Sequence, residues 1–196
     1  MGDVVLAGEE RAGARLIESC QRGDHEAFRR LFESYKDKVY SVALYFFGGD
    51  EALAADITQQ VFVKLFTRIG QFRQESEFTT WLYRLTTNAC IDEQRRRRRF
   101  NPLEVLSARL VPRTRGGAEE RLMRGEAAEA VREAVASLAP NYRAAILLKY
   151  FEELSYEEIA EVLGCSKGTV ASRLNRGHKI LARRLGPLRA KLFQGG

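Results

Sequence analysis

The stretch from Ser155 to Leu185 constrains the fold most, because its capping residues, its glycine and its apolar spacing predict two helices and the turn between them. Ser155 followed three residues later by Glu158 is a capping box, which predicts that a short helix begins there. Gly164 has no Cβ and suits the left-handed conformation that ends a helix. Ser166 is expected to cap a second helix, whose inward residues are Val170, Leu174 and Leu181. This order is the helix-turn-helix pattern.

The charge of the second helix indicates its partner. No acidic residue follows Glu161, whereas basic residues recur to the end of the chain. They are Lys167, Arg173, Arg176, Lys179, Arg183, Arg184, Arg189 and Lys191. A run of this kind is often only a solvated surface. Here the caps, the glycine turn and the one-sided charge agree with one another, and they favour a helix that binds DNA.

Composition limits the other classes of protein. The chain has 196 residues, a net charge of +6 and a pI of about 9.4, which fits a nucleic-acid partner and allows one domain or two small ones. Proline is scarce and the periodic segments have helical spacing, so we expect an all-α fold. Cys20, Cys90 and Cys165 are far apart and form no paired motif, which predicts three reduced thiols in a cytoplasmic protein and no metal site. We expect neither a signal peptide nor a membrane span.

The first part of the chain predicts a small helical bundle. A helix is expected over 14–21, and Asp24 and Asp50 are expected to cap the next two, with a break at Gly48 and Gly49 and an end at Gly70. The apolar positions of the first of these two are Phe28, Leu31, Phe32 and Tyr35. Those of the second are Ile57, Val61, Leu65 and Ile69, with Phe62 and Phe66 widening the stripe.

A helix over 80–99 carries an unusual face. Leu82, Leu85 and Ala89 are expected to point inward. Another side combines an aromatic ring, an amide and two cations: Trp81, Arg84, Asn88 and Arg95. Aromatic rings stack on unpaired bases, amides bind base edges and arginines bind phosphates, so this face suits separated DNA strands. The alternative is that Trp81 belongs to the core. The run of five arginines from Arg95 to Arg99 is expected to meet a phosphate backbone.

The segment 101–117 loses periodicity and contains two of the four prolines, which predicts a flexible linker. The predicted organisation is therefore a first domain over 11–99, a linker over 100–121 and a second domain over 122–191. Two further helices are expected before the helix-turn-helix, over 119–138 and 142–151. Their inward residues are expected to be Ala127, Val131 and Val135 in the first, and Ile146, Leu147 and Tyr150 in the second.

Four segments together resemble a known family. They are DITQQVFVKLF (56–66), FRQESEFTTWLYRLTTNACIDEQRRRRR (72–99), LAPNYRAAILLKYFEELSYEEIAEVLGCS (138–166) and GTVASRLNR (168–176). With them the chain resembles a bacterial RNA polymerase sigma factor of the extracytoplasmic-function (ECF) type, from about Ala14 to Arg184.

For the first domain the resemblance implies a region called σ2, which binds the clamp helices of the polymerase β′ subunit and captures the −10 promoter element as the strands separate. The positions that match the polymerase contact are Asp56, Gln59 and Gln60. The family usually has an acid where Gln60 stands, so Asp56 should carry more of the contact. The positions that match the single-strand contact are Phe72, Trp81, Arg84 and Asn88, and the face argument adds Arg95.

For the second domain the resemblance implies σ4, which reads the −35 element with the second helix of its helix-turn-helix. Ser172, Arg173 and Arg176 match positions near base edges and adjacent phosphates, and Lys167 and Thr169 match positions near the backbone. Ala171 stands where the family often has a basic residue, and Asn175 is also atypical, so promoter preference is expected to be shifted. The linker would run through the RNA-exit path.

The resulting hypothesis is a cytoplasmic, non-enzymatic initiation factor without a cofactor. Its expected partners are core RNA polymerase (β′ and β), promoter DNA and an anti-sigma factor. One rival is a dimeric helix-turn-helix repressor or activator, which leaves the segment 56–66 and the helix face from Trp81 to Asn88 unexplained. The other rival is an enzyme acting on nucleic acid. Its only histidines, His25 and His178, lie in different predicted domains with no catalytic partners nearby.

Overall fold

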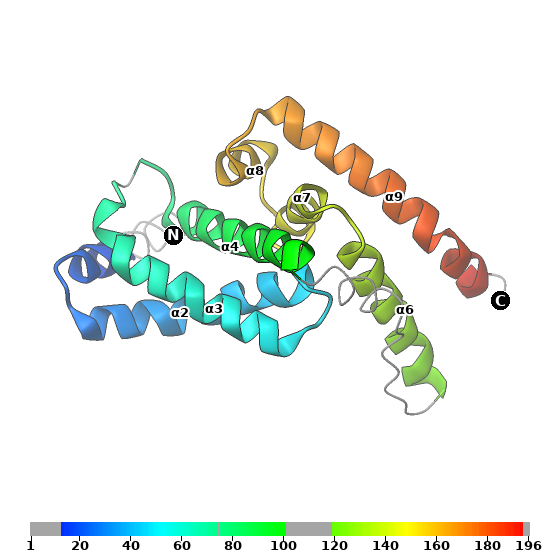
Figure 1. Cartoon of the computed structure of the whole chain (residues 1–196), viewed down its shortest axis with the longest axis horizontal. Helices are drawn as coiled ribbons and strands as arrows, with labels where there is room; N and C mark the ends of the chain where they lie inside the picture. The colour runs from blue at the N-terminus through cyan, green and yellow to red at the C-terminus, as the bar shows by residue number, and fades with distance from the viewer. Residues whose placement is uncertain (1–12, 74, 101–118, 194–196) are drawn as a thin grey trace, which may run out of the picture.

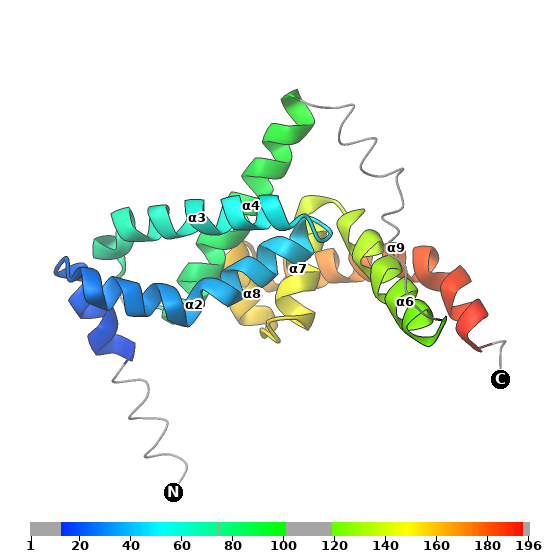
Figure 2. The ribbon, with the colours of Figure 1, turned by 90° about the horizontal axis from the view of Figure 1, so that it is seen from below.

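The computed structural model describes residues 13–73, 75–100 and 119–193, and within these ranges every regular element is helical (Figures 1 and 2). A first helix covers 13–21. The elements that follow are α2 (His25–Phe46), α3 (Glu51–Arg68), the 3-10 turn η1 (Ile69–Gln71), α4 (Phe78–Phe100), α6 (Glu119–Ala136), α7 (Pro140–Tyr150), α8 (Tyr156–Leu163) and α9 (Lys167–Phe193). The predicted all-α fold is confirmed. The predicted linker lies mostly outside the described residues, and the predicted domain boundaries stay a prediction.

Short polar side chains start the helices of the front half, which we define as residues 13–100. The Asp24 carboxylate accepts hydrogen bonds from the backbone amides of Glu26 and Ala27, so α2 begins where predicted. Asp50 accepts from the amide of Leu53 and starts α3 in the same way. Between them Gly48 and Gly49 have positive φ, which ends α2 and turns the chain back. Figure 2 shows α2 and α3 stacked side by side, with the end of α4 projecting beyond them.

The helix-turn-helix is confirmed in detail in the rear half, which we define as residues 119–193. The Ser155 hydroxyl accepts from the amide of Glu158, whose carboxylate accepts from the Ser155 amide, so both halves of the capping box are present. Gly164 ends α8 with φ of 58°. The Ser166 hydroxyl accepts from the amide of Thr169 at the start of α9. Val170 is fully buried.

Three residues expected to point inward are exposed instead. Phe66 is 47% exposed because it lies at the open edge between α2 and α3, which no described element covers. Val131 is 40% exposed although it lies on the same side of α6 as buried Ala134 and Val135, because it stands one turn before them and, among the described side chains, the burial of this side is confined to the end of the helix. Tyr150 is 58% exposed at the last residue of α7, where its hydroxyl lies 2.8 Å from Nε2 of His178 on α9.

The two halves pack directly against each other. Val135, Ala144 and Leu147 of the rear half belong to the same buried cluster as the front-half core. In return, Val42 and Tyr83 of the front half are buried in the cluster that supports the helix-turn-helix. Figure 1 shows α7 lying between α4 and α9, which is how one helix contributes to both clusters. Each of the two buried clusters therefore contains residues from both halves, unlike the independent cores that two tethered domains would have.

Arg143 on α7 is the polar centre of this junction. Its side chain is 2% exposed. One terminal nitrogen donates to the carbonyl of Phe46 at the end of α2, and the other donates to the carbonyls of Ala136 and Leu138. The guanidinium also lies over the Phe46 ring, with its carbon 4.8 Å from the ring centre. One buried cation thus joins the last turn of α2 to the segment between α6 and α7.

The cysteines differ enough in environment for a direct test. Cys20 and Cys90 are buried, and burial raises the pKa of Cys90 to about 12 and raises that of Cys20. Thiolate is the reactive form, so both should be inert at neutral pH while partly exposed Cys165 reacts. We expect a thiol reagent to modify one cysteine in the native protein and three after denaturation. Rapid modification of two or more native thiols, located by peptide mass analysis, would contradict the packing described here.

Candidate nucleic-acid interface and docking groove

The start of α9 presents the predicted −35 residues to solvent. Lys167, Ser172 and Arg176 are exposed, and Thr169 and Arg173 are partly exposed. All five lie on α9, which the packing of Val170 and Leu174 against the rear core orients outward. Because Val170 and Leu174 are buried, the opposite side of the helix is the one left free for a ligand. Thr169, Ser172 and Arg176 lie on that free side, whereas Lys167 and Arg173 are nearer to the buried side and still reach solvent.

The two arginines predicted to contact the −35 element, Arg173 and Arg176, form hydrogen bonds with uncharged groups. Arg176 donates to the Tyr142 hydroxyl on α7 at 3.2 Å, and Arg173 lies 3.5 Å from the Cys165 sulfur. Neither forms an ion pair within the described ranges, so both charges remain available to an anion. By contrast, Lys167 is paired with Glu157 of α8 at 2.5 Å. That pair is exposed and therefore weak, so a phosphate can replace the carboxylate.

The predicted single-strand residues are divided between the core and the surface. Phe72 is buried, and its ring centre lies 5.3 Å from that of Trp81. Trp81 is partly buried and also packs on Phe78 at 6.1 Å. Asn88 and Arg95 are exposed further along α4. Trp81 thus packs against buried aromatic rings while remaining partly exposed, and its contact with single-stranded DNA stays a prediction.

Arg84 has a partner that the sequence did not indicate. Its Nη2 donates to the backbone carbonyl of Glu161 on α8 at 2.7 Å, and it lies 4.0 Å from the Glu161 carboxylate. The two residues are 77 positions apart. Neighbouring Tyr83 donates its hydroxyl hydrogen to the carboxylate of Glu152. Of the four residues on the predicted DNA face of α4, Arg84 thus contacts the rear half, while Asn88 and Arg95 remain exposed.

Acidic residues partly neutralise the arginine run at the end of α4. Glu93 is buried and accepts two bonds from Arg96 at 2.7 and 2.9 Å, which hold the pKa of that carboxyl below its usual value. Arg97 contacts Glu93 and, at 3.8 Å, Asp50. Arg95 lies 3.7 Å from Asp92. Arg98 and Arg99 have no ion pair among the described residues, so the predicted phosphate contact concentrates on the end of this helix.

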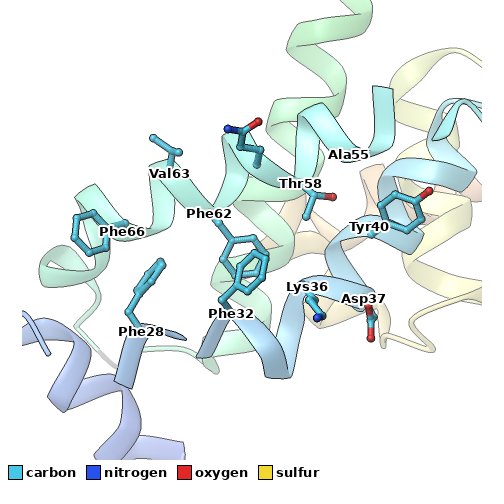
Figure 3. Close-up of a pocket in the computed structure, with 11 residues that line it drawn as sticks. Phe28, Phe32, Lys36, Asp37, Tyr40, Ala55, Thr58, Phe62, Val63 and Phe66 are labelled. Atoms are coloured by element: carbon cyan, nitrogen blue, oxygen red, sulfur yellow. The ribbon is translucent and has the colours of Figure 1, made fainter. Parts of the chain in front are cut away.

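One of the predicted polymerase residues, Gln59, lines an aromatic groove. Asp56, Gln59 and Gln60 are all exposed on α3, within one helical turn. Gln59 also lines a groove of about 530 Å³ between α2 and α3, shown in Figure 3. Its apolar walls are Phe28, Phe32 and Tyr40 from α2, and Phe62, Val63 and Phe66 from α3. Rings from the two helices pack against each other along it, with the ring centres of Phe32 and Phe62 4.7 Å apart and those of Phe28 and Phe66 5.0 Å apart.

This groove was not predicted from the sequence. Val63 is 58% exposed and Phe66 47%, although an apolar stripe normally faces the core. The available signal was their spacing, because Gln59, Val63 and Phe66 follow each other at intervals of four and three along the polar side of α3. A large exposed apolar patch of this kind usually marks an interaction site.

Within the described ranges, no group of histidine, cysteine or carboxylate residues is arranged to hold a metal ion. A search of the same ranges finds no helix with the length and apolar character needed to cross a bilayer.

Comparison with known proteins covers both halves. The family model of Sigma-70 region 2 matches residues 31–100, and that of Sigma-70 region 4 matches residues 128–181. The ECF RNA polymerase sigma factor SigW of Bacillus subtilis is 32% identical over 185 residues, which cover 87% of this chain and 95% of SigW. The ECF sigma-E factor of Escherichia coli K12 is 34% identical, over 88% of this chain and 94% of that relative.

Solved structures share the fold. The sigma factor RpoE of Bartonella quintana, in complex with the anti-sigma factor NepR, matches with a TM-score of 0.60 at 23% identity, over 81% of this chain and 96% of that one. CnrH, in complex with the cytosolic domain of CnrY, matches with a TM-score of 0.62 at 22% identity, over 88% and 96%. With relatives above 30% identity across nearly its whole described length, the chain belongs to the ECF family of RNA polymerase sigma factors, which direct core RNA polymerase to promoters.

Proposed function

We propose that this chain binds core RNA polymerase through α3, reads the −35 element with α9 and holds the separated −10 strand with α4. Binding energy stabilises the open strands, and the polymerase supplies the chemistry. Two modest DNA contacts on one chain reinforce each other, since the second becomes intramolecular once the first has formed. The site of action is the cytoplasm, where core polymerase and promoter DNA are found together.

One observation carries this proposal, namely the coexistence of a docking groove and a recognition helix. An operator-binding repressor needs the exposed start of α9 but has no use for the groove lined by Gln59. An aromatic groove of this size suits an amphipathic helix laid along it, with polar residues at the rim setting its orientation. The clamp helices of β′ are such a partner.

Run-off transcription with purified core polymerase on a library of randomised promoters tests the proposal. We expect the full chain to make core-dependent transcripts whose templates share two separated sequence elements. A chain that binds duplex DNA but neither retains β′ in a pull-down nor stimulates transcription would be an operator-binding regulator, and the proposal would fail.

Control by an anti-sigma factor is a second part of the proposal. The solved relatives RpoE and CnrH are in complex with the anti-sigma factor NepR and with the cytosolic domain of CnrY. A partner of that kind would act on the same groove and the same DNA faces. Affinity purification of the chain from its native host should recover an inhibitor that blocks run-off transcription. Recovery of polymerase alone under every condition would contradict this part.

Asp56→Lys tests the polymerase contact. Asp56 is exposed on α3 with no ion pair in the described structure, so reversal should preserve the fold while opposing any basic partner. We expect the affinity for core polymerase to fall about tenfold, because a favourable charge contact becomes a repulsive one. Fluorescence anisotropy of labelled protein titrated with core enzyme measures this change. Glu51→Lys, on the same helix but outside the predicted contact, is the matched control, and equal losses for both would remove the assignment.

Trp81→Ala tests the single-strand contact. We expect about a tenfold loss of strand opening, because base stacking on an aromatic side chain contributes about 1–3 kcal/mol and the Trp81 ring is only partly exposed. Permanganate footprinting of promoter complexes reports opening, and polymerase binding should remain normal. Because Trp81 packs on Phe72, the variant's thermal melting must be measured alongside. Normal opening combined with a lowered melting temperature would assign Trp81 to the core alone.

A further inference from the structure

A close helix crossing fixes which side of α9 faces outward. Val170 and Leu174 are buried, and Gly177 continues the same buried side one turn later. A Cβ at Gly177 would lie 3.0 Å from Cγ1 of Ile146 on α7 and 3.2 Å from its Cδ1, so the glycine lets the two helices approach closely at this point. Close packing of this kind leaves α9 no freedom to rotate about its axis. The direction of each side chain on the outward side therefore follows from the helical period.

The outward side carries a short polar strip. Ser172, Asn175 and Lys179 follow one another at intervals of three and four, opposite the buried residues, and all three are exposed. Ser172 is among the residues predicted to contact the −35 element. Asn175 lies between the other two and has no role in the proposed function so far.

The Asn175 amide is free, whereas the neighbouring cations are already engaged. Arg176 donates to the Tyr142 hydroxyl and Arg173 contacts the Cys165 sulfur. The Asn175 side chain forms no hydrogen bond with any residue in the described ranges. Its carbonyl oxygen and its amino group are thus both available to a ligand that approaches the outward side of α9.

The chemistry of an asparagine side chain selects one base. It places an acceptor and a donor side by side on a short stem. In the major groove, adenine presents the matching pair, with N7 as an acceptor and the N6 amino group as a donor, whereas guanine presents two acceptors. Asn175 stands in the third turn of α9, within the first part of the helix, which is the part that contacts base edges. One turn earlier Ala171 is exposed and small, so it leaves the amide room to reach a base.

We propose that Asn175 reads an adenine in the −35 element, accepting a hydrogen bond from N6 and donating one to N7, and thereby sets the base preference at that position. The inference rests on the proposed function and names a base that the recognition helix selects. Arg176 points about 100° further round the helix and is held towards Tyr142, so the two side chains are directed to different parts of the groove.

Selection of promoters by the complete holoenzyme tests the assignment. The full chain with core polymerase is incubated with promoters randomised across the −35 region, and the bound fraction is sequenced. We expect the unmodified chain to prefer adenine about tenfold at one position. Asn175→Ala should lose the preference at that position and keep it at the others. Asn175→Arg should prefer guanine there, because the arginine fork matches O6 and N7 of guanine.

His178→Ala is the matched control on the same helix. His178 follows Asn175 by three residues, but its ring is bonded to the Tyr150 hydroxyl of α7, on the side of α9 that packs. Its removal should leave the base preference at every −35 position unchanged. The other −35 positions are an internal control for folding of the Asn175 variants, since a misfolded helix would lose preference at all of them.

A modified base distinguishes direct contact from an indirect effect. In 7-deazaadenine a C–H group replaces N7, while pairing with thymine is unaffected. We expect a promoter with this base at the selected position to bind the unmodified holoenzyme about fivefold more weakly, which corresponds to the loss of one hydrogen bond. The Asn175→Ala holoenzyme should bind the modified and the ordinary promoter equally.

Three results would overturn the assignment: an Asn175→Ala profile identical to that of the unmodified chain, an equal loss of affinity for every sequence, or a selected −35 element in which no adenine depends on Asn175. In each case the proposed function stands as long as the unmodified holoenzyme selects a −35 element. Failure of the unmodified chain to bind core polymerase, or to select any −35 base, would instead remove the proposed function itself.

Discussion

Replacing Arg143 with alanine is expected to lower the free energy of unfolding by about 3–5 kcal/mol. The side chain is buried and supplies a charged donor to the carbonyls of Phe46, Ala136 and Leu138. Hydrogen bonds to charged groups contribute about 1.5–3 kcal/mol each, less when several share one donor, and the buried carbonyls would be left without it. The loss is large because these acceptors close the ends of two helices in two halves of the molecule.

Urea denaturation followed by circular dichroism measures this loss. Arg30→Ala is the control, since Arg30 is exposed on α2 and should change stability by less than about 0.5 kcal/mol. Arg143→Lys should recover only part of the stability, because an ammonium cannot reproduce the planar set of donors. A loss below about 1 kcal/mol for Arg143→Ala would show that the junction between the halves does not depend on this residue.

Replacing Arg176 with alanine is expected to reduce promoter discrimination by about 1–3 kcal/mol, which is the range for one good bidentate base contact. The side chain is exposed on the recognition helix, and its bond to the Tyr142 hydroxyl holds the guanidinium without neutralising it. Such a restraint lowers the entropy lost when a base is bound. Transcription from the preferred promoter should fall, while transcription from promoters altered at one −35 position should be unaffected.

Tyr142→Phe separates orientation from contact. It removes the hydroxyl partner and leaves the arginine, so we expect a smaller loss with the same base preference. Arg184→Ala, two turns further along α9, should weaken all promoters alike if it binds a phosphate, and it is the matched control. An equal loss on every promoter for Arg176→Ala would assign Arg176 to the phosphate backbone as well.

The sequence was sufficient to predict structural features whose interacting residues are close together in the chain. Asp24, Asp50 and Ser155 cap helices as predicted, because a short acceptor next to free backbone amides acts within three residues. Gly164 ends α8 as predicted, because a residue without Cβ adopts the left-handed conformation easily and this effect is confined to its own position. The exposed recognition residues followed from the period of the helix, since burial of Val170 and Leu174 settles which side of α9 remains free.

Contacts between residues far apart in the chain could not be predicted from the periodicity of the sequence. Nothing local distinguishes Arg143 from the other arginines, yet its acceptor at Phe46 lies 97 positions away. The same holds for Arg84, which was assigned to DNA from its helix face and is bonded to Glu161. Phe66 was assigned to the core because it is apolar, but whether an apolar face is covered depends on which helix lies opposite.

The helices, their caps and the basic recognition face are thus determined by residues that lie within one or two helical turns of each other, and they can be predicted from the sequence. The groove between α2 and α3, the buried arginine at the junction and the contact of α4 with α8 arise from packing between segments far apart in the chain. Hydrophobic burial is not directional. An apolar or charged pattern therefore indicates that a helix face will contact another surface, but it does not indicate which surface that is.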